Sequence, residues 1–426
     1  MVPARLGRRV NRVAEVVAPA RLGVGFRWLL SSSWISNLGD GIAIAAGPLL
    51  VASLTDEAFL VAMAALLQWL PPLLFGLFAG ALSDRLDRRA IVVTVDTLRA
   101  LILVVLAAAI LTGTVSIAIV LVTLFILSTA EVFADNASQT ILPMLVARDD
   151  LVLANARIQA GFVTINQLAG PPIGALLFAV GMALPFIGQS MLVAAGAILV
   201  SRISLARHAR DPESRRALRH EIAEGFRWVR HHAAVRTLVL TIFIFNITFG
   251  AAWSVLVLYA TQRLGLGEVG FGLLTTVIAC GGVLGTFSYG WITRRVTLGN
   301  IMRIGLIIET LTHLGLALTT TPAVAMAIFF VFGAHAFIWG TTSVTVRQRA
   351  VPTELQGRVG SVNTVGVFGG LVIGSALGGI LAQRFGVTAP FWFAFVGSAL
   401  FVVLIWRELR HIAHADEAPE PLSPSV

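Results

Sequence analysis

Long apolar stretches recur along nearly the whole chain, and they constrain the fold more than any other feature. A helix that spans a lipid bilayer needs about 20 mostly apolar residues. Twelve stretches meet this requirement, with approximate bounds of 27–53, 58–82, 90–112, 115–137, 154–180, 184–205, 237–261, 269–293, 299–320, 322–346, 358–383 and 389–407. The sequence therefore predicts an all-α membrane protein with twelve transmembrane helices.

The composition excludes other classes. Only 12% of the residues are charged, against about 25% in soluble domains, which argues against a water-soluble fold. All 31 basic residues are Arg, so the chain lacks the Lys of an ATP-binding Walker A loop, and uphill transport would need an ion gradient. We find no metal-ligand spacing and no nucleophile with its base, so we expect no enzyme, cofactor or metal. The single Cys280 lies in an apolar segment, and we expect it to be a small buried packing residue.

The net charge of +9 indicates membrane topology rather than nucleic-acid binding, because the Arg residues flank the apolar segments. Assigning both termini to the cytoplasm places all but three of the 31 Arg on the inner side or at its helix ends, the exceptions being Arg99, Arg263 and Arg384. Positive residues concentrate on the cytoplasmic side of membrane proteins. The predicted orientation therefore has both termini in the cytoplasm.

The longest polar connection, residues 202–236, divides the chain into two halves. Within it Ile222, Phe226 and Val229 recur at helical spacing beside several Arg, which predicts an amphipathic helix on the inner leaflet. The expected parts are a basic cytoplasmic arm, an N-terminal six-helix bundle, a linker with the amphipathic helix, a C-terminal six-helix bundle and a disordered cytoplasmic tail. Their bounds are 1–27, 28–205, 206–236, 237–407 and 408–426.

The two halves share residues at a shift of 209 to 210 positions, which indicates an internal repeat. The coincidences are Asn37 and Gly41 with Asn246 and Gly250, Gly80 and Arg85 with Gly290 and Arg295, and Gln139 and Pro143 with Gln348 and Pro352. The copy is degraded, because Arg294 stands where the first half has Asp84. We therefore expect two pseudo-symmetric six-helix halves.

Glycines one helical turn apart occur in the second, fifth, eighth and eleventh predicted helices. Small residues at this spacing let helix backbones approach closely. The residues are Gly76, Gly80, Gly170, Gly174, Gly281, Gly285, Gly366, Gly370, Gly374 and Gly378. The spacing predicts one shared packing role for helices three apart, although static packing is the alternative for any single pair.

Several motifs resemble the major facilitator superfamily of secondary transporters. The segment GLFAGALSDRLDRR, residues 76–89, resembles the loop between the second and third helices of that superfamily, but has Asp87 where the family usually has Gly. Residues 135–146, 153–156 and 224–228 resemble the bacterial branch with enterobactin exporters and macrolide efflux pumps. The sequence from Gly170 to Gly174, which contains Pro171, resembles the Gly-Pro motif of drug and proton antiporters.

The resemblance implies a gate and a sliding seam. In the family, helices two, five, eight and eleven line the seam between the halves. The Asp that matches Asp84 faces the N-terminus of helix eleven, and the Arg residues of the same loop pair with acids of helix four. The gating residues implied here are Asp84, Arg85, Arg88, Arg89, Asp135 and Arg99. The alternative for the charged loop is a topology signal only.

Asp40, near the middle of the first predicted helix, is the first candidate for proton coupling. A charged side chain at the bilayer centre costs about 2.5–3.5 kcal/mol on insertion scales, so such residues usually face a cavity or a partner. Loss of water also favours the neutral form of a carboxyl group, which suits a residue that takes up and releases a proton. The alternative is a structural Asp capped by neighbouring Ser or Asn.

Other buried ionisable residues offer weaker candidates. Glu131 and Asp135 lie one turn apart, and their spacing from Asp96 and Arg99 predicts that Arg99 neutralises Glu131 or Asp135. A clamp of this kind is structural, and a proton relay through Glu131 is the alternative.

Glu309 and His313, at i and i+4, either satisfy each other or shuttle protons. His335 stands alone, and we expect it to make one internal hydrogen bond.

Together these features predict a transporter of the bacterial inner membrane that exports a small amphiphilic compound in exchange for protons. The expected partners are the substrate, protons and the bilayer, with no nucleic acid and a monomeric state. Acids outnumber Arg within the predicted helices, which favours neutral or cationic substrates. A siderophore exporter or a proton-coupled importer of the same fold is the alternative. Candidate cavity residues are Trp34, Asn37, Gln68, Asn166, Gln167, Asn246, Trp253 and Asn363.

Overall fold

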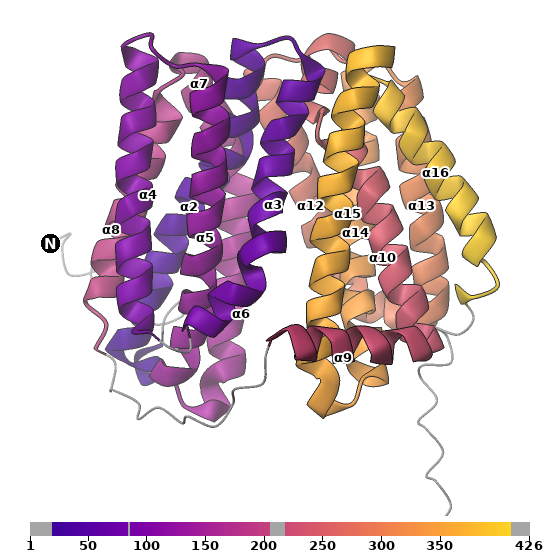
Figure 1. Cartoon of the computed structure of the whole chain (residues 1–426), viewed down its shortest axis with the longest axis horizontal. Coiled ribbons are helices and arrows are strands. Elements are labelled where there is room, and N and C mark those ends of the chain that lie inside the picture. The colour runs from indigo at the N-terminus through magenta and orange to yellow at the C-terminus, as the bar shows by residue number, and fades with distance from the viewer. Residues whose placement is uncertain (1–18, 84–85, 205–217, 410–426) are drawn as a thin grey trace, which may run out of the picture. The chain divides into compact units, whose positions relative to one another are not determined.

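The computed structural model describes residues 19–83, 86–204 and 218–409, and all regular elements in these ranges are helical (Figure 1). Eleven of the described helices are long and apolar enough to cross a membrane, and a further apolar helix, α16 (Ala389–Ile405), has 17 residues. The twelve predicted segments thus correspond to eleven helices of spanning length and one shorter apolar helix. The predicted all-α membrane fold is confirmed.

The chain forms two compact units, Met1–Arg210 with Gly265–Thr276, and Asp211–Leu264 with Val277–Val426. In the first unit, α2 packs against α7 and α8, and α5 packs against α3 and α4. The helices of this unit run alongside one another (Figure 1). Its elements are η1 (Ala20–Leu22), α2 (Gly23–Leu54), α3 (Ala58–Ser83), α4 (Arg88–Leu111), α5 (Ile117–Leu145), η2 (Arg148–Asp150), α6 (Leu151–Gly161), η3 (Phe162–Ala169), α7 (Gly170–Val180) and α8 (Leu184–Ser201).

Proline changes the backbone in the middle of the fifth predicted helix. Pro171 and Pro172 lack an N–H group, and a proline ring clashes with the carbonyl four residues earlier. The preceding residues Phe162–Ala169 form the π-helix η3, a wider turn that is a recognised way of accommodating such a break. The predicted helix 154–180 is therefore three successive elements, α6, η3 and α7.

The second unit contains the long helices α10, α13, α14 and α15. Here α10 packs along α15, and α13 packs against both α14 and α16. Residues 268–276 of α12 belong to the first unit. The described elements from residue 218 to α16 are α9 (Leu218–His231), α10 (Ala233–Trp253), α11 (Leu256–Leu258), η4 (Tyr259–Arg263), α12 (Glu268–Thr293), α13 (Leu298–Leu318), α14 (Pro322–Ala350), η5 (Thr353–Leu355) and α15 (Gln356–Phe385).

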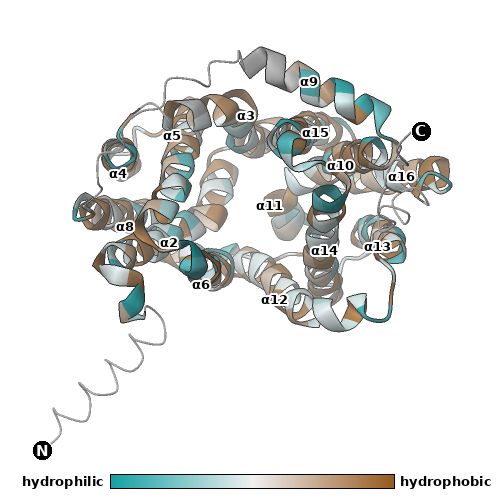
Figure 2. Ribbon diagram, turned by 90° about the horizontal axis from the view of Figure 1, so that it is seen from below, coloured by the Kyte–Doolittle hydropathy of each residue, from teal (hydrophilic) through white to brown (hydrophobic). Residues whose placement is uncertain are grey.

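Helix α9 lies across the ends of α10 and α15 instead of running along them (Figure 1), and it carries both hydrophilic and hydrophobic residues (Figure 2). Val229 is buried in an apolar cluster with Val235 and Val359. The carboxylate of Glu224 accepts a hydrogen bond from Arg358 at 2.6 Å. Phe226 is 61% exposed, so the predicted apolar stripe is only partly buried against the protein.

The glycine pairs pack closely within the units at three of the four predicted positions. A Cβ added at Gly170 or Gly174 would collide with the α2 backbone, and one added at Gly281 would collide with the α14 backbone. The Gly370 to Gly378 ladder meets α10 in the same way. At Gly76, by contrast, no described atom lies within 4 Å of an added Cβ, so this pair does not mark a close helix contact within its unit.

Cys280 is exposed, so its predicted burial is wrong. The glycine face of α12, with Gly281 and Gly285, packs against α14. Cys280 falls instead on the face of α12 that carries the exposed side chains of Leu284 and Phe287, because these residues follow it at helical spacing. Apolar sequence surroundings therefore indicated a membrane helix but not which face of it points inward.

Some predictions fall outside the described residues. These are the basic arm through residue 18, the linker residues 205–217, the tail from residue 410, and Asp84 and Arg85 of the charged loop. The domain boundaries at 28–205 and 237–407 stay predictions. The loop residue Asp87 is described, and its side chain caps α4 by accepting a hydrogen bond from the Ala90 N–H at 3.2 Å. This cap explains why Asp is accommodated where the resembling family has Gly.

We expect Gly374→Ala to destabilise the protein, and Gly360→Ala in the same helix to leave its stability unchanged or slightly higher. An added Cβ at Gly374 meets the backbone of Ile247 and Ala251, whereas nothing lies within 4 Å at Gly360. Overpacking costs about 1–3 kcal/mol. Thermal unfolding of both purified variants in detergent tests this, and equal midpoints for the two would contradict the close packing of α15 on α10.

Candidate functional site

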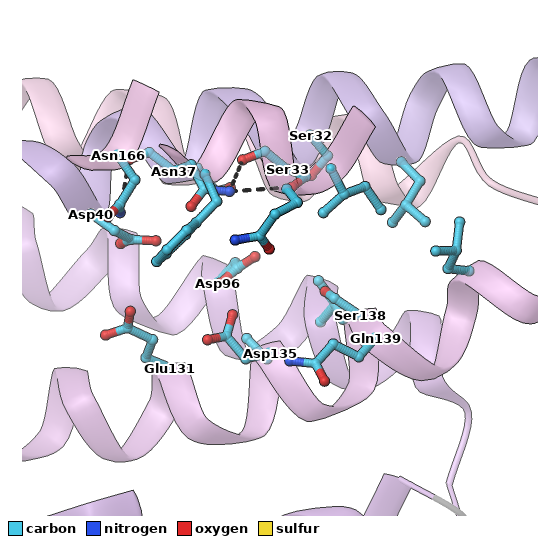
Figure 3. Close-up of a pocket in the computed structure, with 18 of the residues that line it drawn as sticks. Ser32, Ser33, Asn37, Asp40, Asp96, Glu131, Asp135, Ser138, Gln139 and Asn166 are labelled. Atoms are coloured by element: carbon cyan, nitrogen blue, oxygen red, sulfur yellow. Dashed lines mark hydrogen bonds between the residues drawn. The ribbon is translucent and has the colours of Figure 1, made fainter. Parts of the chain in front are cut away.

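A polar cavity of about 800 Å³ lies within the first unit, between α2, α4, α5, α6 and η3. Figure 3 shows the carboxylates of Asp40, Asp96, Glu131 and Asp135 gathered in it. The polar residues that line it are Ser32, Ser33, Ser36, Asn37, Asp40, Asp96, Arg99, Glu131, Asp135, Ser138, Gln139, Asn155, Gln159 and Asn166. A cavity of this size matches the volumes of small-molecule binding sites.

Arg99 joins two walls of the cavity through a buried ion-pair cluster. Its Nη2 lies 2.6 Å from the Asp40 Oδ1 on α2, and its Nη1 lies 3.0 Å from the Asp96 Oδ1 on α4. The side chains of Arg99 and Asp96 are 4% and 6% exposed, whereas that of Asp40 is 17% exposed. Asp40 is therefore the member of the cluster that is most accessible from the cavity.

Glu131 and Asp135 project from α5 toward Asp40 and Asp96 (Figure 3). Neither makes an ion pair or a side-chain hydrogen bond with another described residue. The charged residues of the cavity are thus four acids and one Arg. Because charges interact more strongly away from bulk water, this excess of acids favours bound cations or bound protons.

Amide side chains order the wall of the cavity next to Asp40. The Asn166 Nδ2 donates to the Asn37 carbonyl at 3.2 Å, and the Gln167 Nε2 donates to the Asn166 Oδ1 at 2.7 Å. Gly41 permits this arrangement, because an added Cβ there would meet the backbone of Asn166 and Gly170. The π-helix η3 and α2 can therefore approach each other directly beside Asp40.

The predicted partners of Arg99 are corrected by this geometry. The sequence predicted that Arg99 neutralises Glu131 or Asp135, but its ion pairs are with Asp40 and Asp96. Asp96 is three residues before Arg99 on the same helix, so it is within reach of the guanidinium without any change in helix packing. Asp40 is consequently paired with Arg99 and not merely capped by a neighbouring Ser or Asn.

The predicted cavity residues of the first half separate into two groups. Asn37 and Asn166 line the cavity. The Trp34 Nε1 instead donates to the Arg157 carbonyl at 3.1 Å, and the indole packs where Gly161 lacks a side chain. Gln68 lies on α3, where its carbonyl accepts a hydrogen bond from Ser128. Trp34, Gln68 and Gln167 are not among the residues that line this cavity.

The predicted cavity residues of the second half lie in the second unit. The Asn246 Nδ2 donates to the Ile242 carbonyl of its own helix at 2.7 Å. Trp253 belongs to an aromatic cluster in which its ring centroid is 4.6 Å from that of Phe249. The Asn363 Oδ1 is buried and has no hydrogen-bond partner among the described residues.

Glu309 pairs with His335 and not with His313, so the predicted mutual contact of Glu309 and His313 is wrong, while proton shuttling by these residues stays a prediction. The Glu309 Oε2 lies 3.6 Å from the His335 Nε2, across α13 and α14. Both ring nitrogens of His313 are buried without a hydrogen-bond partner among the described residues. His335 is therefore not alone, and the i, i+4 spacing of Glu309 and His313 does not produce a contact.

Two predicted gating residues tie α4 to other helices. The Arg88 Nη1 donates to the Thr140 carbonyl of α5 at 3.2 Å, and the Arg89 Nη1 donates to the Ile203 carbonyl after α8 at 2.9 Å. Asp135, also a gating candidate, lines the cavity. Asp84 and Arg85 lie outside the described residues.

Sequence reasoning missed several polar residues of the cavity that a helical pattern could have revealed. Ser32 and Ser36 precede Asp40 at intervals of four, and Ser138 follows Glu131 and Asp135 on the same face of α5. Polar residues at this spacing in an apolar helix predict that one face of the helix lines a water-accessible cavity. In the described part of the chain no three His, Cys, Asp or Glu are placed to hold a metal ion.

Three comparisons place this chain among known proteins. It is 29% identical to the multidrug efflux pump Tap of Mycolicibacterium fortuitum, over 85% of this chain and 90% of that protein. It is 25% identical to macrolide efflux protein A of Streptococcus pyogenes, over 82% of this chain and 87% of that protein. The fold resembles a bacterial homologue of the iron transporter ferroportin in an inward-facing state, with a TM-score of 0.74, 16% identity and coverage of 90% and 98%.

The comparison with protein families covers nearly the entire chain. Residues 14–424 match the family described as transmembrane secretion effector, which is a branch of the major facilitator superfamily. Both the resemblance noted in the sequence and the fold agree with this match. The protein is therefore a multi-pass membrane transporter, not an enzyme, and belongs to the transmembrane secretion effector family of bacterial efflux transporters.

Proposed function

We propose that this protein exports a small amphiphilic compound, neutral or cationic, from the bacterial cytoplasm in exchange for protons. The observation that carries the proposal is the cavity of the first unit, in which four acids face one Arg. The relatives named as a multidrug efflux pump and a macrolide efflux protein support a drug-like or macrolide-like substrate. The excess of carboxylates argues against a polyanionic siderophore.

Exchange follows from competition for the same carboxylates. A cationic substrate is held best when Glu131 and Asp135 are ionised, and protonation of either acid weakens the attraction. By linkage, the bound cation must then weaken proton binding by the same factor. Protons that enter from outside therefore promote release of the cation, and its rebinding from inside promotes release of the protons.

Asp40 has the contacts expected of the coupling residue. It is the most exposed member of the Arg99 cluster, so it can gain a proton from the cavity while Arg99 keeps Asp96 as a partner. Protonation of Asp40 would remove the Asp40–Arg99 ion pair, which connects α2 to α4, and would leave the Asp96–Arg99 pair within α4. In alternating access, such a change shifts the balance between the inward-facing and outward-facing states.

The remaining proposed roles follow the same scheme. Glu131 relays protons to Asp40, and Glu309 with His335 offers a second ionisable pair in the other unit, while the unpaired His313 has less support. We propose that Asp84, Arg85, Arg88 and Arg89 bias the gate. The helices that carry the glycine pairs line the sliding seam, and the close contacts at Gly170, Gly281 and Gly374 hold three of these helices within their own units. The termini lie in the cytoplasm, and the working unit is a monomer.

We expect Asp40→Asn and Glu131→Gln each to reduce pH-driven efflux at least about tenfold while the protein is still produced. Removing a carboxyl group removes a proton-binding site. The matched control is Asp149→Asn, because Asp149 is an exposed acid outside the cavity. Drug-dependent proton release in everted membrane vesicles measures the effect, with the protein level in each membrane determined in parallel.

Efflux that keeps its pH dependence in Asp40→Asn would contradict the role of that residue. Substrate-driven proton movement of the opposite sign in the unaltered protein would identify an importer.

The substrate class predicts a specific order of transport. In everted vesicles, a cationic dye and a macrolide should accumulate at higher rates than a catecholate siderophore, because the cavity carries more acids than Arg. Raised salt should change this order little, since charges away from bulk water are screened weakly. Transport of the catecholate alone would favour the siderophore exporter instead.

Arg99→Met should destabilise the folded protein by about 3–5 kcal/mol, because it leaves two buried carboxylates without a counter-charge. The triple variant Asp40→Asn, Asp96→Asn and Arg99→Met should fold again but lack pH-driven efflux. Arg384→Met, at an exposed Arg, is the matched control for the loss of one charge. Gel filtration and thermal unfolding in detergent measure these effects. An Arg99→Met variant as stable as the unaltered protein would contradict a stabilising role for the ion pairs of Arg99 with Asp40 and Asp96.

A further inference from the structure

A groove of about 450 Å³ lies at one end of the second unit, where α12 ends, α13 begins and α16 ends. It contains two guanidinium groups, from Arg295 and Arg303, together with Trp406. We propose that this groove binds the headgroup of an anionic phospholipid, with one acyl chain lying along α13. The proposal concerns lipid binding and is independent of the proposed transport function.

Both guanidinium groups are held by aromatic rings and not by acids. The Arg295 Cζ lies 4.2 Å from the ring centroid of Trp291, and the Arg303 Cζ lies 5.6 Å from that of Trp406. No described acid forms an ion pair with either residue. Cation–π contacts orient a guanidinium while its N–H groups stay free to bind an anion.

Arg303 has donor capacity left over. Its Nη1 is 3.4 Å from the Asn300 Oδ1, and its buried Nε has no hydrogen-bond partner among the described residues. A buried donor without an acceptor costs free energy. A guanidinium has five N–H donors, so those of its Nη groups that Asn300 does not use can donate charge-assisted hydrogen bonds to a phosphate oxygen in the groove.

The start of α13 adds a second source of positive potential. Its N-cap Thr297 also lines the groove and accepts a hydrogen bond from the Asn300 N–H at 3.4 Å. The first N–H groups of a helix lack partners within the helix, so its N-terminus favours anions. The helix end and the two guanidinium groups therefore attract the same negatively charged group.

Apolar side chains distinguish a lipid from a free phosphate ion. Ile304 and Ile307 follow Asn300 along α13 by about one and two helical turns. Both line the groove, and they are 50% and 40% exposed. Trp406 is 43% exposed, and Trp is enriched where membrane helices meet the headgroup region. Charge followed by exposed apolar surface along one helix matches a phospholipid, whose phosphate adjoins its acyl chains.

The internal repeat explains why the second unit has this site. The second-half copy of the charged loop has Arg294, next to the groove residue Arg295, where the first half has Asp84, so this position adds no acid beside the two guanidinium groups. The groove is therefore complementary to a lipid with a net negative charge and not to a zwitterionic one.

The test is lipid binding by the purified full-length transporter, measured by native mass spectrometry. Phosphatidylglycerol and phosphatidylcholine with the same acyl chains are compared in Arg295→Gln/Arg303→Gln and in the matched control Arg148→Gln/Arg384→Gln, whose residues lie outside the groove and outside α9. Both variants lose two exposed or partly exposed Arg. We expect the unaltered protein and the control to prefer phosphatidylglycerol about tenfold, and the groove variant to lose this preference.

Additional variants and controls distinguish loss of the lipid site from loss of folding or binding of a free anion. Arg303→Lys, which keeps the charge, should retain part of the preference, and gel filtration reports whether each variant is folded. Equal binding of the two lipids by the unaltered protein would overturn the proposal, as would an equal loss in the control variant. Displacement of phosphatidylglycerol by glycerol phosphate at equal concentration would show a site for free anions and would also reject the lipid.

Discussion

The connection of α2 to α4 in the first unit depends on the ion pairs of the buried Arg99 guanidinium. An isolated charge within a membrane is costly, and an ion pair is stable there only when its partners are close and well oriented. Arg99 meets this condition through Asp40 on α2 and Asp96 on α4. The two helices are therefore connected by a contact that any change in the charge of Asp40 alters directly.

Around this cluster, in contrast, two acids have no ion-pair partner among the described residues. Glu131 and Asp135 face the Arg99 cluster across the cavity, and no described residue neutralises them by an ion pair. Apolar side chains at these two positions would cost less to bury than unpaired carboxylates. Their presence beside a hydrogen-bonded wall of Asn37 and Asn166 is expected where protons or cations bind and leave.

The membrane fold could be predicted because the length and polarity of each helix are properties of the local sequence. Partners could not be predicted, because they depend on helix rotation and side-chain direction. Arg99 was assigned to the wrong acids and Glu309 to the wrong His, and Cys280 is exposed instead of buried. That Asp40 faces a cavity and a partner could be predicted, because the cost of its charge in the bilayer does not depend on which neighbour neutralises it.

The two units differ in chemistry although their sequences repeat. The first concentrates its buried charge in one cavity with four acids. The second unit has an aromatic cluster around Trp253, on the same helix as Asn246, which repeats Asn37. Its Glu309 is paired with His335 and its Glu224 with Arg358. A pseudo-symmetric fold needs matching helix packing, which the close contacts of Gly41 with Gly170 and of Gly250 with Leu371 provide in the two units. It does not need matching charges, so electrostatic coupling can be confined to one half while the other supplies apolar surface.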